Sequence, residues 1–283
     1  MESADNLTEP QISLQQLLAE AKVARLDAEL LLAHVLTTAR STLIAHGERC
    51  IGPDQALRYR TLVARRAAGE PLAYLTGERE FWSLPLRVNE AVLIPRPETE
   101  LVVERALALL SESRARTGQV RIADLGTGSG AIALALASAR PHWRLLASEL
   151  SAPALQVARD NARRLQLNQI EFIEGDWFAP LVRRRFEAIV SNPPYVAAGD
   201  PALDRLRHEP AAALSPGHSG MEALLHLIAG ARAHLSAGGW LVLEHGADQA
   251  PRVAAALVAT GYARVRCHRD LAGHDRVTEA QWS

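Results

Sequence analysis

Asn192-Pro193-Pro194-Tyr195 is the stretch of this chain whose residue types and order best suit chemistry. The apolar run before it, 186–190, is typical of a strand in a sheet that is covered on both faces. Both prolines fix φ and lack an N–H donor, and Pro193 disfavours the helical region for Asn192. We expect a rigid loop that offers acceptors to a substrate amino group, with the Tyr195 ring as a stacking surface. A proline-rich strand exit without function is the alternative for these residues alone.

A glycine-rich turn lies upstream, at 124–130, between a predicted strand at 120–125 and a predicted helix at 131–139. Glycine lets the backbone turn sharply and approach a ligand closely, next to the positive end of a helix. The spacing is G-x-G-x-G rather than the G-x-G-x-x-G of dinucleotide-dependent oxidoreductases, which weakens a pyrophosphate interpretation. Such turns also serve packing alone. The residues that we expect to contact a cofactor here are Gly126, Thr127, Gly128, Ser129 and Gly130.

The next two predicted strands also end in residues with suitable chemistry. Glu149 follows a strand predicted at 143–148, at the position where a carboxylate can accept hydrogen bonds from both ribose hydroxyls of a nucleoside. A surface acid that precedes a helix is the alternative. Asp176 and Trp177 follow a strand predicted at 170–175, where they can face an adenine, although a buried core tryptophan remains an alternative. We expect Glu149 and Trp177 to contact the cofactor.

The elements that must position these residues alternate between strand and helix from Val120 onward, which predicts a doubly wound α/β fold with a mostly parallel sheet. In such a sheet the carboxyl ends of the strands meet along one edge, so the motifs gather there. Residues 199–216 contain three prolines and little periodicity, and we expect a loop over the substrate side. The later predicted elements are helices at 221–235 and 249–260, a strand at 240–243 and a closing strand pair at 263–267 and 276–280.

The part of the chain before Leu75 is predicted to be helical and carries no catalytic constellation. His34 and His46 are isolated on helices, so we assign them no role. Between Leu75 and Ile94 the apolar period changes to two, which predicts a hairpin with arms at 78–82 and 84–88. The expected helices lie at about 13–24, 26–36, 41–47 and 53–68. The expected parts are a helical, substrate-docking domain at 1–74, a hairpin linker at 75–95 and a catalytic domain at 96–283.

Composition narrows the possible partners. The chain has 283 residues, 48% of them apolar, and its 31 basic and 32 acidic side chains leave a net charge of −1. This balance gives no electrostatic footprint for direct nucleic-acid binding. Two distant cysteines, Cys50 and Cys267, argue against a disulfide framework or a cysteine zinc site. Neither a leader at Met1–Asp5 nor a long apolar run is evident, so we expect a cytoplasmic monomer without a metal or a membrane span.

The glycine turn, the acid Glu149, Asp176-Trp177 and N-P-P-Y together resemble an S-adenosylmethionine-dependent methyltransferase. Further motifs are similar to those of the release factor glutamine methyltransferase family (PrmC/HemK), over nearly the whole chain. They are L-T-G through F-W at 75–82, I-P-R-P-E-T-E at 94–100, S-G-M at 219–221 and L-E-H-G at 243–246. Glu149 is a departure, because the family often has Asp there. The resemblance implies a Rossmann-like methyltransferase fold with an antiparallel C-terminal hairpin, and S-adenosylmethionine as cofactor.

The resemblance also implies an activity: methylation of the side-chain amide nitrogen (N5) of the glutamine in the Gly-Gly-Gln motif of class I peptide chain release factors. Asn192, Pro193 and Tyr195 are then the catalytic residues, Asn192 also contacts the cofactor, and Pro194 completes the substrate-binding loop. Glu244 and His245 follow the next apolar strand, and we assign them no catalytic role. One alternative is the same chemistry on a ribosomal-protein glutamine or a nucleic-acid amino group. The other is a dehydrogenase or a non-catalytic nucleotide-binding scaffold.

Overall fold

The computed structural model describes residues 12–113 and 120–283. The chain divides into two compact units, one up to Gly77 and one from Glu78 onward. The predicted hairpin therefore belongs to the second unit by its contacts. The sequence expectation about Met1–Asp5 lies outside the described residues.

The first unit is a small helical domain with its own apolar core, built around buried Leu17, Leu31, Leu32 and Tyr59. Ser13 caps the first helix as its spacing predicts, because its hydroxyl accepts from the Gln16 backbone nitrogen at 3.2 Å. The elements are β1 Ile12–Ser13, α1 Leu14–Glu20, α2 Arg25–Leu36, α3 Arg40–Ala45, β2 Cys50–Ile51, α4 Pro53–Ala67 and α5 Leu72–Thr76. The pairing of β1 with β2 and the short helix α5 were not predicted.

The second unit contains a seven-stranded sheet in the order β10-β11-β9-β8-β5-β6-β7. Its five consecutive strands from β9 to β7 run parallel, and β11 and β10 pair antiparallel at one edge. The strands are β5 Arg121–Leu125, β6 Arg144–Glu149, β7 Ile170–Glu174, β8 Phe186–Ser191, β9 Leu235–Glu244, β10 Ala263–Arg269 and β11 Asp275–Gln281. This arrangement confirms the predicted doubly wound, mostly parallel sheet with an antiparallel C-terminal hairpin.

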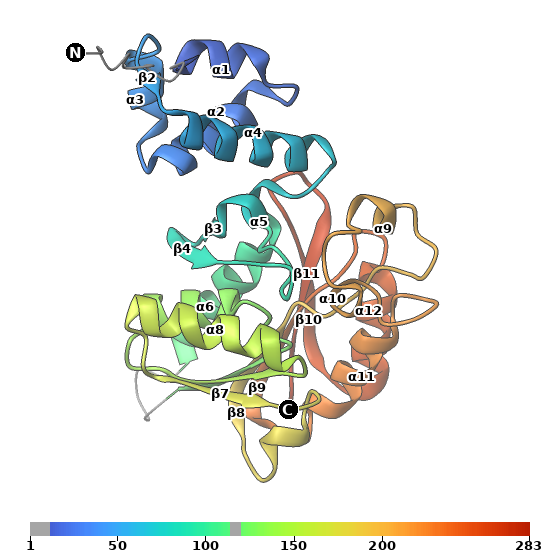
Figure 1. Ribbon diagram of the computed structural model, residues 1–283. Helices are drawn as coiled ribbons and strands as arrows, with labels where there is room; N and C mark the ends of the chain where they lie inside the picture. The colour runs from blue at the N-terminus through green and yellow to red at the C-terminus, as the bar shows by residue number, and fades with distance from the viewer. Residues whose placement is uncertain (1–11, 114–119) are drawn as a thin grey trace, which may run out of the picture. The chain divides into compact units, whose positions relative to one another are not determined.

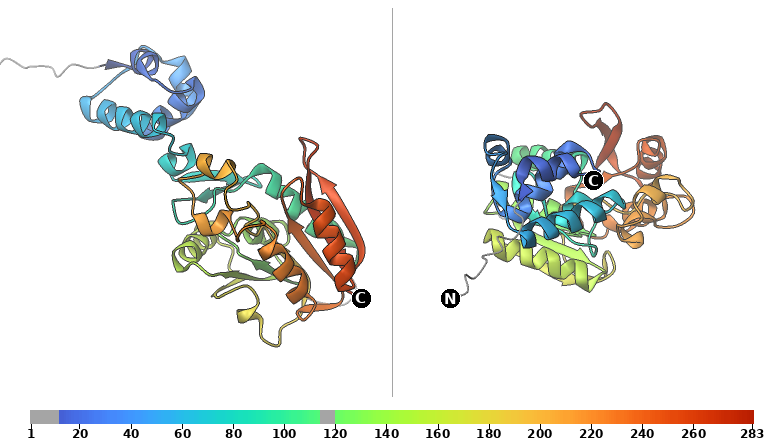
Figure 2. Two further views of the ribbon diagram at one scale, coloured as in Figure 1. Left: turned by 90° about the vertical axis from the view of Figure 1, so that its right-hand side faces the viewer. Right: turned by 45° about the horizontal axis from the view of Figure 1, so that its top comes forward.

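Helices cover both faces of this sheet, as Figure 1 shows. On β5, Ile122 packs into the core that contains α6 and α7, whereas its neighbour Ala123 packs into the core that contains α11 and α12. Helices α11 and α12 face the viewer in the left panel of Figure 2. The helices are η1 Pro97–Thr99, α6 Glu100–Ser113, α7 Ala131–Ala139, α8 Ala152–Leu165, η2 Ala179–Leu181, α9 Ala202–Arg205, α10 Ala211–Leu214, α11 Glu222–Ala231 and α12 Ala250–Thr260.

The predicted hairpin forms between β3, Glu78–Phe81, and β4, Leu84–Arg87. Side chains of α6 and α8 hold it at both ends. At the turn, Glu100 accepts a hydrogen bond of 2.8 Å from the Trp82 backbone nitrogen. At the far end, the Asn161 amide pairs with both backbone groups of Arg87 and also donates to the Ser129 carbonyl oxygen at 3.0 Å. The Asn161 side chain thus links the hairpin to the glycine-rich turn.

Two segments depart from the expected elements. Strand β9 begins at Leu235, several residues before the predicted strand, and includes Gly238 and Gly239. The register between β8 and β9 shifts in this region, so the glycines lie in an irregular strand rather than in a turn. Residues 199–216 are not a structureless loop, because they contain the short helices α9 and α10.

Candidate active site

A cavity of about 280 Å³ opens at the carboxyl ends of β5, β6, β7 and β8. This is the edge of a doubly wound sheet where ligands bind. Its wall contains the glycine turn, Glu149, Asp176, Trp177 and Asn192. Sequence motifs that lie up to about seventy residues apart in the chain are therefore neighbours, because parallel strands bring their carboxyl ends together.

The glycine turn is held in shape by a buried carboxyl. Asp124 is fully buried and accepts from the Thr127 hydroxyl at 2.5 Å and from the Ala133 backbone nitrogen at 3.2 Å. Burial raises the pKa of Asp124 to about 7. Gly126 has a φ of 70°, and a β-carbon there would lie 3.2 Å from the Trp177 ring. The glycine therefore satisfies both a left-handed conformation and a close approach of the tryptophan.

Glu149 lies at the end of β6 with both carboxylate oxygens engaged. Its Oε2 accepts from the Gly128 backbone nitrogen at 2.9 Å, and its Oε1 accepts from the Ser151 nitrogen at 3.0 Å. Each oxygen keeps a further lone pair for a hydroxyl donor in the cavity. These contacts fix the carboxylate against the glycine turn, so the longer arm of Glu is held in a single place.

The N-P-P-Y loop begins where Ser191 bridges two strand ends, donating to the Leu125 carbonyl oxygen at 2.6 Å. Asn192 and Pro194 line the cavity, whereas Pro193 and Tyr195 do not. The Asn192 amide nitrogen, Nδ2, donates to the Thr99 hydroxyl oxygen at 3.1 Å. The amide oxygen of Asn192, Oδ1, is then the end of the side chain that can accept from a ligand.

The Tyr195 ring packs against the core on the α11 and α12 side, and its hydroxyl donates to Glu244 Oε1 at 3.1 Å. Burial raises the pKa of Tyr195, so the phenol stays protonated and acts as a donor. Glu244 is fully buried at the end of β9, and burial raises its pKa to about 7. The sequence predicted a role for the Tyr195 ring alone, as a stacking surface. The structure adds a contact of its hydroxyl with Glu244.

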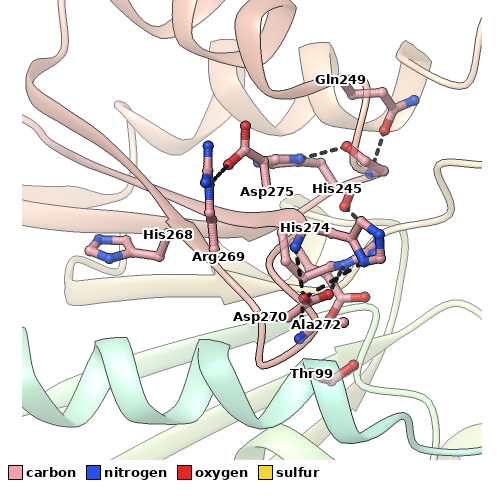
Figure 3. A network of polar contacts seen from close by, with 12 residues as sticks. Thr99, His245, Gln249, His268, Arg269, Asp270, Ala272, His274 and Asp275 are labelled. Carbon is pink, nitrogen blue, oxygen red and sulfur yellow. Dashed lines mark hydrogen bonds and ion pairs between the residues drawn. The ribbon is translucent and has the colours of Figure 1, made fainter.

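A network of polar contacts joins the segment after β9 to the C-terminal hairpin (Figure 3). Arg276 donates to the His245 carbonyl oxygen at 3.2 Å and to Asp270 at 3.3 Å. Asp270 in turn accepts from the backbone nitrogens of Ala272 and His274, each at 2.9 Å. Arg276 lies close enough to Glu244 to lower the pKa of that carboxyl. It therefore offsets part of the cost of a buried negative charge.

Gln249 holds the N-P-P-Y loop against the S-G-M turn. Its amide nitrogen donates to the carbonyl oxygens of Tyr195, at 3.0 Å, and Gly220, at 3.2 Å. Its amide oxygen accepts from the Gly246 nitrogen at 2.8 Å (Figure 3). A β-carbon at Gly220 would lie 2.4 Å from the Tyr195 carbonyl oxygen, so only glycine fits there. These contacts give physical roles to the sequences at 219–221 and 243–246.

The segment at 94–100 forms another part of the cavity wall, through Pro95, Arg96 and Thr99. Buried Glu209, from the segment between α9 and α10, accepts from the Ile94 backbone nitrogen at 3.0 Å and pairs with Arg96. Pro210, Ala212 and Ala213, which follow Glu209, line the same cavity. The two segments therefore close this side of the site together.

The cavity brings most of the predicted cofactor residues together and leaves one outside. Gly126 to Ser129, Glu149, Trp177 and Asn192 contribute to the wall, whereas Gly130 does not. Gly130 has a φ of 87° and packs closely against Ala158, so its position is explained by the turn into α7. Sequence reasoning missed Thr99 and Glu209, and it considered Glu244 but assigned it no catalytic role. For Glu244 a signal exists, since it is a carboxylate at the end of an apolar strand next to the N-P-P-Y strand.

Comparison with known proteins identifies the family. Residues 12–77 match the family described as PrmC N-terminal domain, and residues 102–257 match the family described as Methyltransferase small domain. The chain is 46% identical to the release factor glutamine methyltransferase of Coxiella burnetii, covering 94% of this chain and 95% of the relative. It is also 46% identical to the release factor glutamine methyltransferase of Escherichia coli K12, covering 90% of this chain and 91% of that relative. The chain belongs to the release factor glutamine methyltransferase family.

Solved structures of other methyltransferases share the fold of this family member at low sequence identity. The catalytic domain of hMettl16, solved with an RNA hairpin, aligns with a TM-score of 0.57 and 17% identity over 82% of this chain and 80% of that one. The 16S rRNA methyltransferase RsmC of T. Thermophilus, solved with AdoMet and guanosine, aligns with a TM-score of 0.54 and 19% identity. The latter alignment covers 73% of this chain and 50% of that one.

The cavity of this family member fits S-adenosylmethionine by the chemistry of its wall. The glycine turn provides a cradle that β-carbons would fill, Glu149 provides acceptors for ribose hydroxyls, and Trp177 provides an aromatic surface. Within residues 12–113 and 120–283, no group of three or more His, Cys, Asp or Glu side chains is arranged to hold a metal ion. None of the helices in those ranges has the length and apolar character needed to cross a bilayer.

Proposed function

We propose that this protein methylates the side-chain amide nitrogen of the glutamine in the Gly-Gly-Gln motif of class I peptide chain release factors. The observation that carries the proposal is that Asn192 lines the cavity and donates its amide nitrogen to Thr99, so its amide oxygen is the end of the side chain that can accept from the substrate. The relatives named as release factor glutamine methyltransferases span nearly the whole chain, which supports the same substrate class.

The site must overcome the low nucleophilicity of an amide nitrogen, whose lone pair is delocalised. When bound, S-adenosylmethionine supplies an electrophilic methyl group. We propose that Asn192 Oδ1 and the Pro193 carbonyl oxygen accept the two hydrogens of the glutamine amide and hold its nitrogen in line for attack. Positioning of this kind contributes about 7–11 kcal/mol when the geometry is a near-attack one. The proton released from the methylated amide can pass to these acceptors or to water.

For the cofactor, we propose contacts from the glycine turn, Glu149 and Trp177. The backbone of Gly126 to Gly130 approaches the ligand, Glu149 accepts from its ribose hydroxyls, and Trp177 flanks its adenine. The wall positions of Gly126, Glu149 and Trp177 support these roles. Gly130 contributes through the shape of the turn, which its left-handed φ maintains.

We further propose that the helical domain, which the sequence pattern places at 1–74, docks the release factor. It has its own apolar core, and its sequence carries no catalytic constellation. The protein then acts in the cytoplasm as a monomer and without binding nucleic acid directly. A net charge of −1 supports the last point, and two free, exposed cysteines suit a reducing compartment.

A substrate competition tests this proposal. Tritiated S-adenosylmethionine is offered with purified release factor, with ribosomal proteins and with ribosomal RNA in separate reactions. We expect label in the release factor alone. A change of its Gly-Gly-Gln glutamine to alanine should abolish the label. Labelling of a ribosomal-protein glutamine or of a nucleic-acid amino group instead would assign the same chemistry to another substrate and refute the proposal.

A further inference from the structure

We propose that Gln249 is a positioning residue for methyl transfer, which sets the place of the Pro193 carbonyl oxygen by holding the exit of the N-P-P-Y loop. The inference rests on the proposed function, because that carbonyl is one of the two acceptors assigned to the glutamine amide. Gln249 is buried just before α12 and does not line the cavity. It therefore acts on the substrate only through the loop.

The side-chain amide of Gln249 is fully engaged by three backbone groups. Its nitrogen donates to the carbonyl oxygens of Tyr195, at 3.0 Å, and Gly220, at 3.2 Å. Its oxygen accepts from the Gly246 nitrogen at 2.8 Å (Figure 3). No other side chain of this length offers two donors and an acceptor in one planar group. A single residue thus joins the N-P-P-Y loop to the S-G-M turn and to the segment after β9.

The S-G-M turn leaves no space for the loop exit to shift toward it. Gly220 has a φ of 71°, and a β-carbon there would lie 2.4 Å from the Tyr195 carbonyl oxygen and 3.0 Å from Gln249 Nε2. The Tyr195 carbonyl is therefore packed directly against the Gly220 backbone while Gln249 binds it. A side chain at position 220 would push the carbonyl out of this place.

The residues that follow the loop are paired through their backbone as well. The Val196 nitrogen donates to the Leu214 carbonyl oxygen, and the Ala198 nitrogen donates to that of Gly217, both at 2.9 Å. These bonds hold the chain after the loop through its donors, whereas Gln249 holds the Tyr195 carbonyl, an acceptor. Protection of the two amides from exchange with solvent therefore reports whether the loop exit is fixed.

Two prolines make the loop a stiff connection between its exit and the reacting groups. Pro193 and Pro194 have a fixed φ and no N–H group that could form other bonds. The Pro193 carbonyl lies only two residues before that of Tyr195. A displacement of the Tyr195 backbone therefore reaches the Pro193 carbonyl with few rotations to absorb it. A misplacement of about 1 Å at a reacting group can lower the rate about a hundredfold, so loss of Gln249 should act on kcat.

The test uses the full-length protein with three variants. Gln249→Leu keeps the approximate size of the side chain and removes all three of its hydrogen bonds. Gln249→Glu keeps the acceptor for Gly246 and removes at least one of the two donors. Gly220→Ala keeps Gln249 and displaces the Tyr195 carbonyl by a β-carbon.

The matched controls are Gln169→Leu and Gln169→Glu. Gln169 is partly buried outside the cavity, and its amide nitrogen donates to the Ala137 carbonyl oxygen at 2.8 Å. We measure kcat with release factor and S-adenosylmethionine both saturating, divided by the number of cofactor-binding sites. Calorimetry gives that number and the cofactor Kd. Hydrogen exchange of the Val196 and Ala198 amides is followed by nuclear magnetic resonance in the free protein.

We expect Gln249→Leu and Gly220→Ala each to lower kcat per cofactor-binding site by about tenfold to a hundredfold. Gln249→Glu should lower it by about tenfold or more, because the acceptor for Gly246 alone does not hold the loop. The cofactor Kd should change by less than about threefold, since the glycine turn and Glu149 are untouched. Exchange of the two reporter amides should become faster by about tenfold or more in all three variants. The Gln169 controls should show none of these effects.

Three results would overturn the inference: a kcat within about twofold of wild type in Gln249→Leu, a wild-type kcat in Gln249→Glu, or an equal loss in the Gln169 controls. Should Gln249→Leu not fold, Gln249→Glu and Gly220→Ala decide by the same measurements. Failure of the proposed function looks different. Wild-type protein would then leave the release factor unmodified, while hydrogen exchange in the free protein would still report whether Gln249 holds the loop exit.

Discussion

The carboxylate of Glu209 accepts a hydrogen bond of 3.0 Å from the backbone nitrogen of Ile94 and also pairs with the Arg96 guanidinium. Glu209 is almost fully buried, and it precedes residues that line the cavity. A single side chain therefore joins two parts of the cavity wall that lie more than a hundred residues apart in sequence.

Glu209→Ala should loosen this part of the wall. The change removes the acceptor of the buried Ile94 nitrogen, and a buried donor left without its partner costs about 1–3 kcal/mol. We expect faster proteolysis within 199–216 and weaker binding of S-adenosylmethionine, by about tenfold or more. Calorimetry and limited proteolysis measure both. Asp204→Ala, at an exposed position in α9, is the control. Equal cofactor affinity in the two variants would contradict the role given to Glu209.

Glu149→Ala should weaken cofactor binding without an equal effect on chemistry. Charge-assisted hydrogen bonds to ribose hydroxyls are each worth about 1.5–3 kcal/mol, so the cofactor Kd should rise by about tenfold to a hundredfold or more. The turnover number should recover at saturating cofactor. Glu149→Gln keeps the shape of the side chain but not its charge, so its cofactor Kd should lie between those of wild type and Glu149→Ala. A loss of kcat that persists at saturation would show that Glu149 acts beyond binding.

The glycine turn and Glu149 were predictable because their signals are local. A strand, a run of glycines and an acid at a fixed distance need only the sequence order of neighbouring elements to be placed. The sheet topology followed from the same alternation. The element boundaries that were predicted wrongly also have local causes. Helix α5 spans only five residues, too few for a clear periodic pattern. The glycines in the first half of β9 are typical of a turn, so that half was not predicted as strand.

The contacts of Tyr195 and Thr99 were not predictable in the same way. Tyr195 meets Glu244 because Ser191 on β8 pairs with Leu243 on β9, a register that no local pattern encodes. Thr99 reaches Asn192 from the short helix η1, ninety-three residues away in the chain. Polar contacts between distant segments depend on side-chain packing, and the sequence shows only that their residue types are present.

Asp124 and Glu244 should give the two kinetic parameters different pH dependences. Burial raises both pKa values to about 7. Asp124 supports the glycine turn, so the KM for S-adenosylmethionine should rise as the pH falls below about 7. Glu244 accepts from the Tyr195 hydroxyl of the N-P-P-Y loop, so kcat at saturating cofactor should fall in the same range. Initial rates across this pH range, with and without saturating cofactor, separate the effects. A pH-independent kcat would contradict the second assignment.

The same two groups should influence the stability of the fold in the opposite direction. A carboxyl whose pKa is raised on folding contributes stability below its ordinary pKa, near 4, and loses that contribution as the pH rises to about 7. Glu244→Gln removes one such group. The decline in the free energy of unfolding between these pH values should therefore be smaller in the variant than in wild type. Urea unfolding at several pH values measures this, and an unchanged slope would contradict the raised pKa of Glu244.

Removal of residues 1–77, at the boundary between the two compact units, should separate docking from chemistry. The remaining unit keeps the cavity and its own cores, so cofactor affinity should stay nearly unchanged. The KM for intact release factor should rise by about tenfold or more if the helical domain docks it. A short Gly-Gly-Gln peptide should be methylated equally by both forms. Equal KM values for intact release factor would contradict a docking role.

The most direct test of the central claim is mass spectrometry of the Gly-Gly-Gln peptide of a release factor, after incubation with saturating S-adenosylmethionine and either wild type or Asn192→Ala. We predict that wild type adds one methyl group to the glutamine side chain, and that Asn192→Ala adds it at least about a hundredfold more slowly. Near-normal methylation by Asn192→Ala at saturation, or a methyl group on any other residue, would contradict this account of the site.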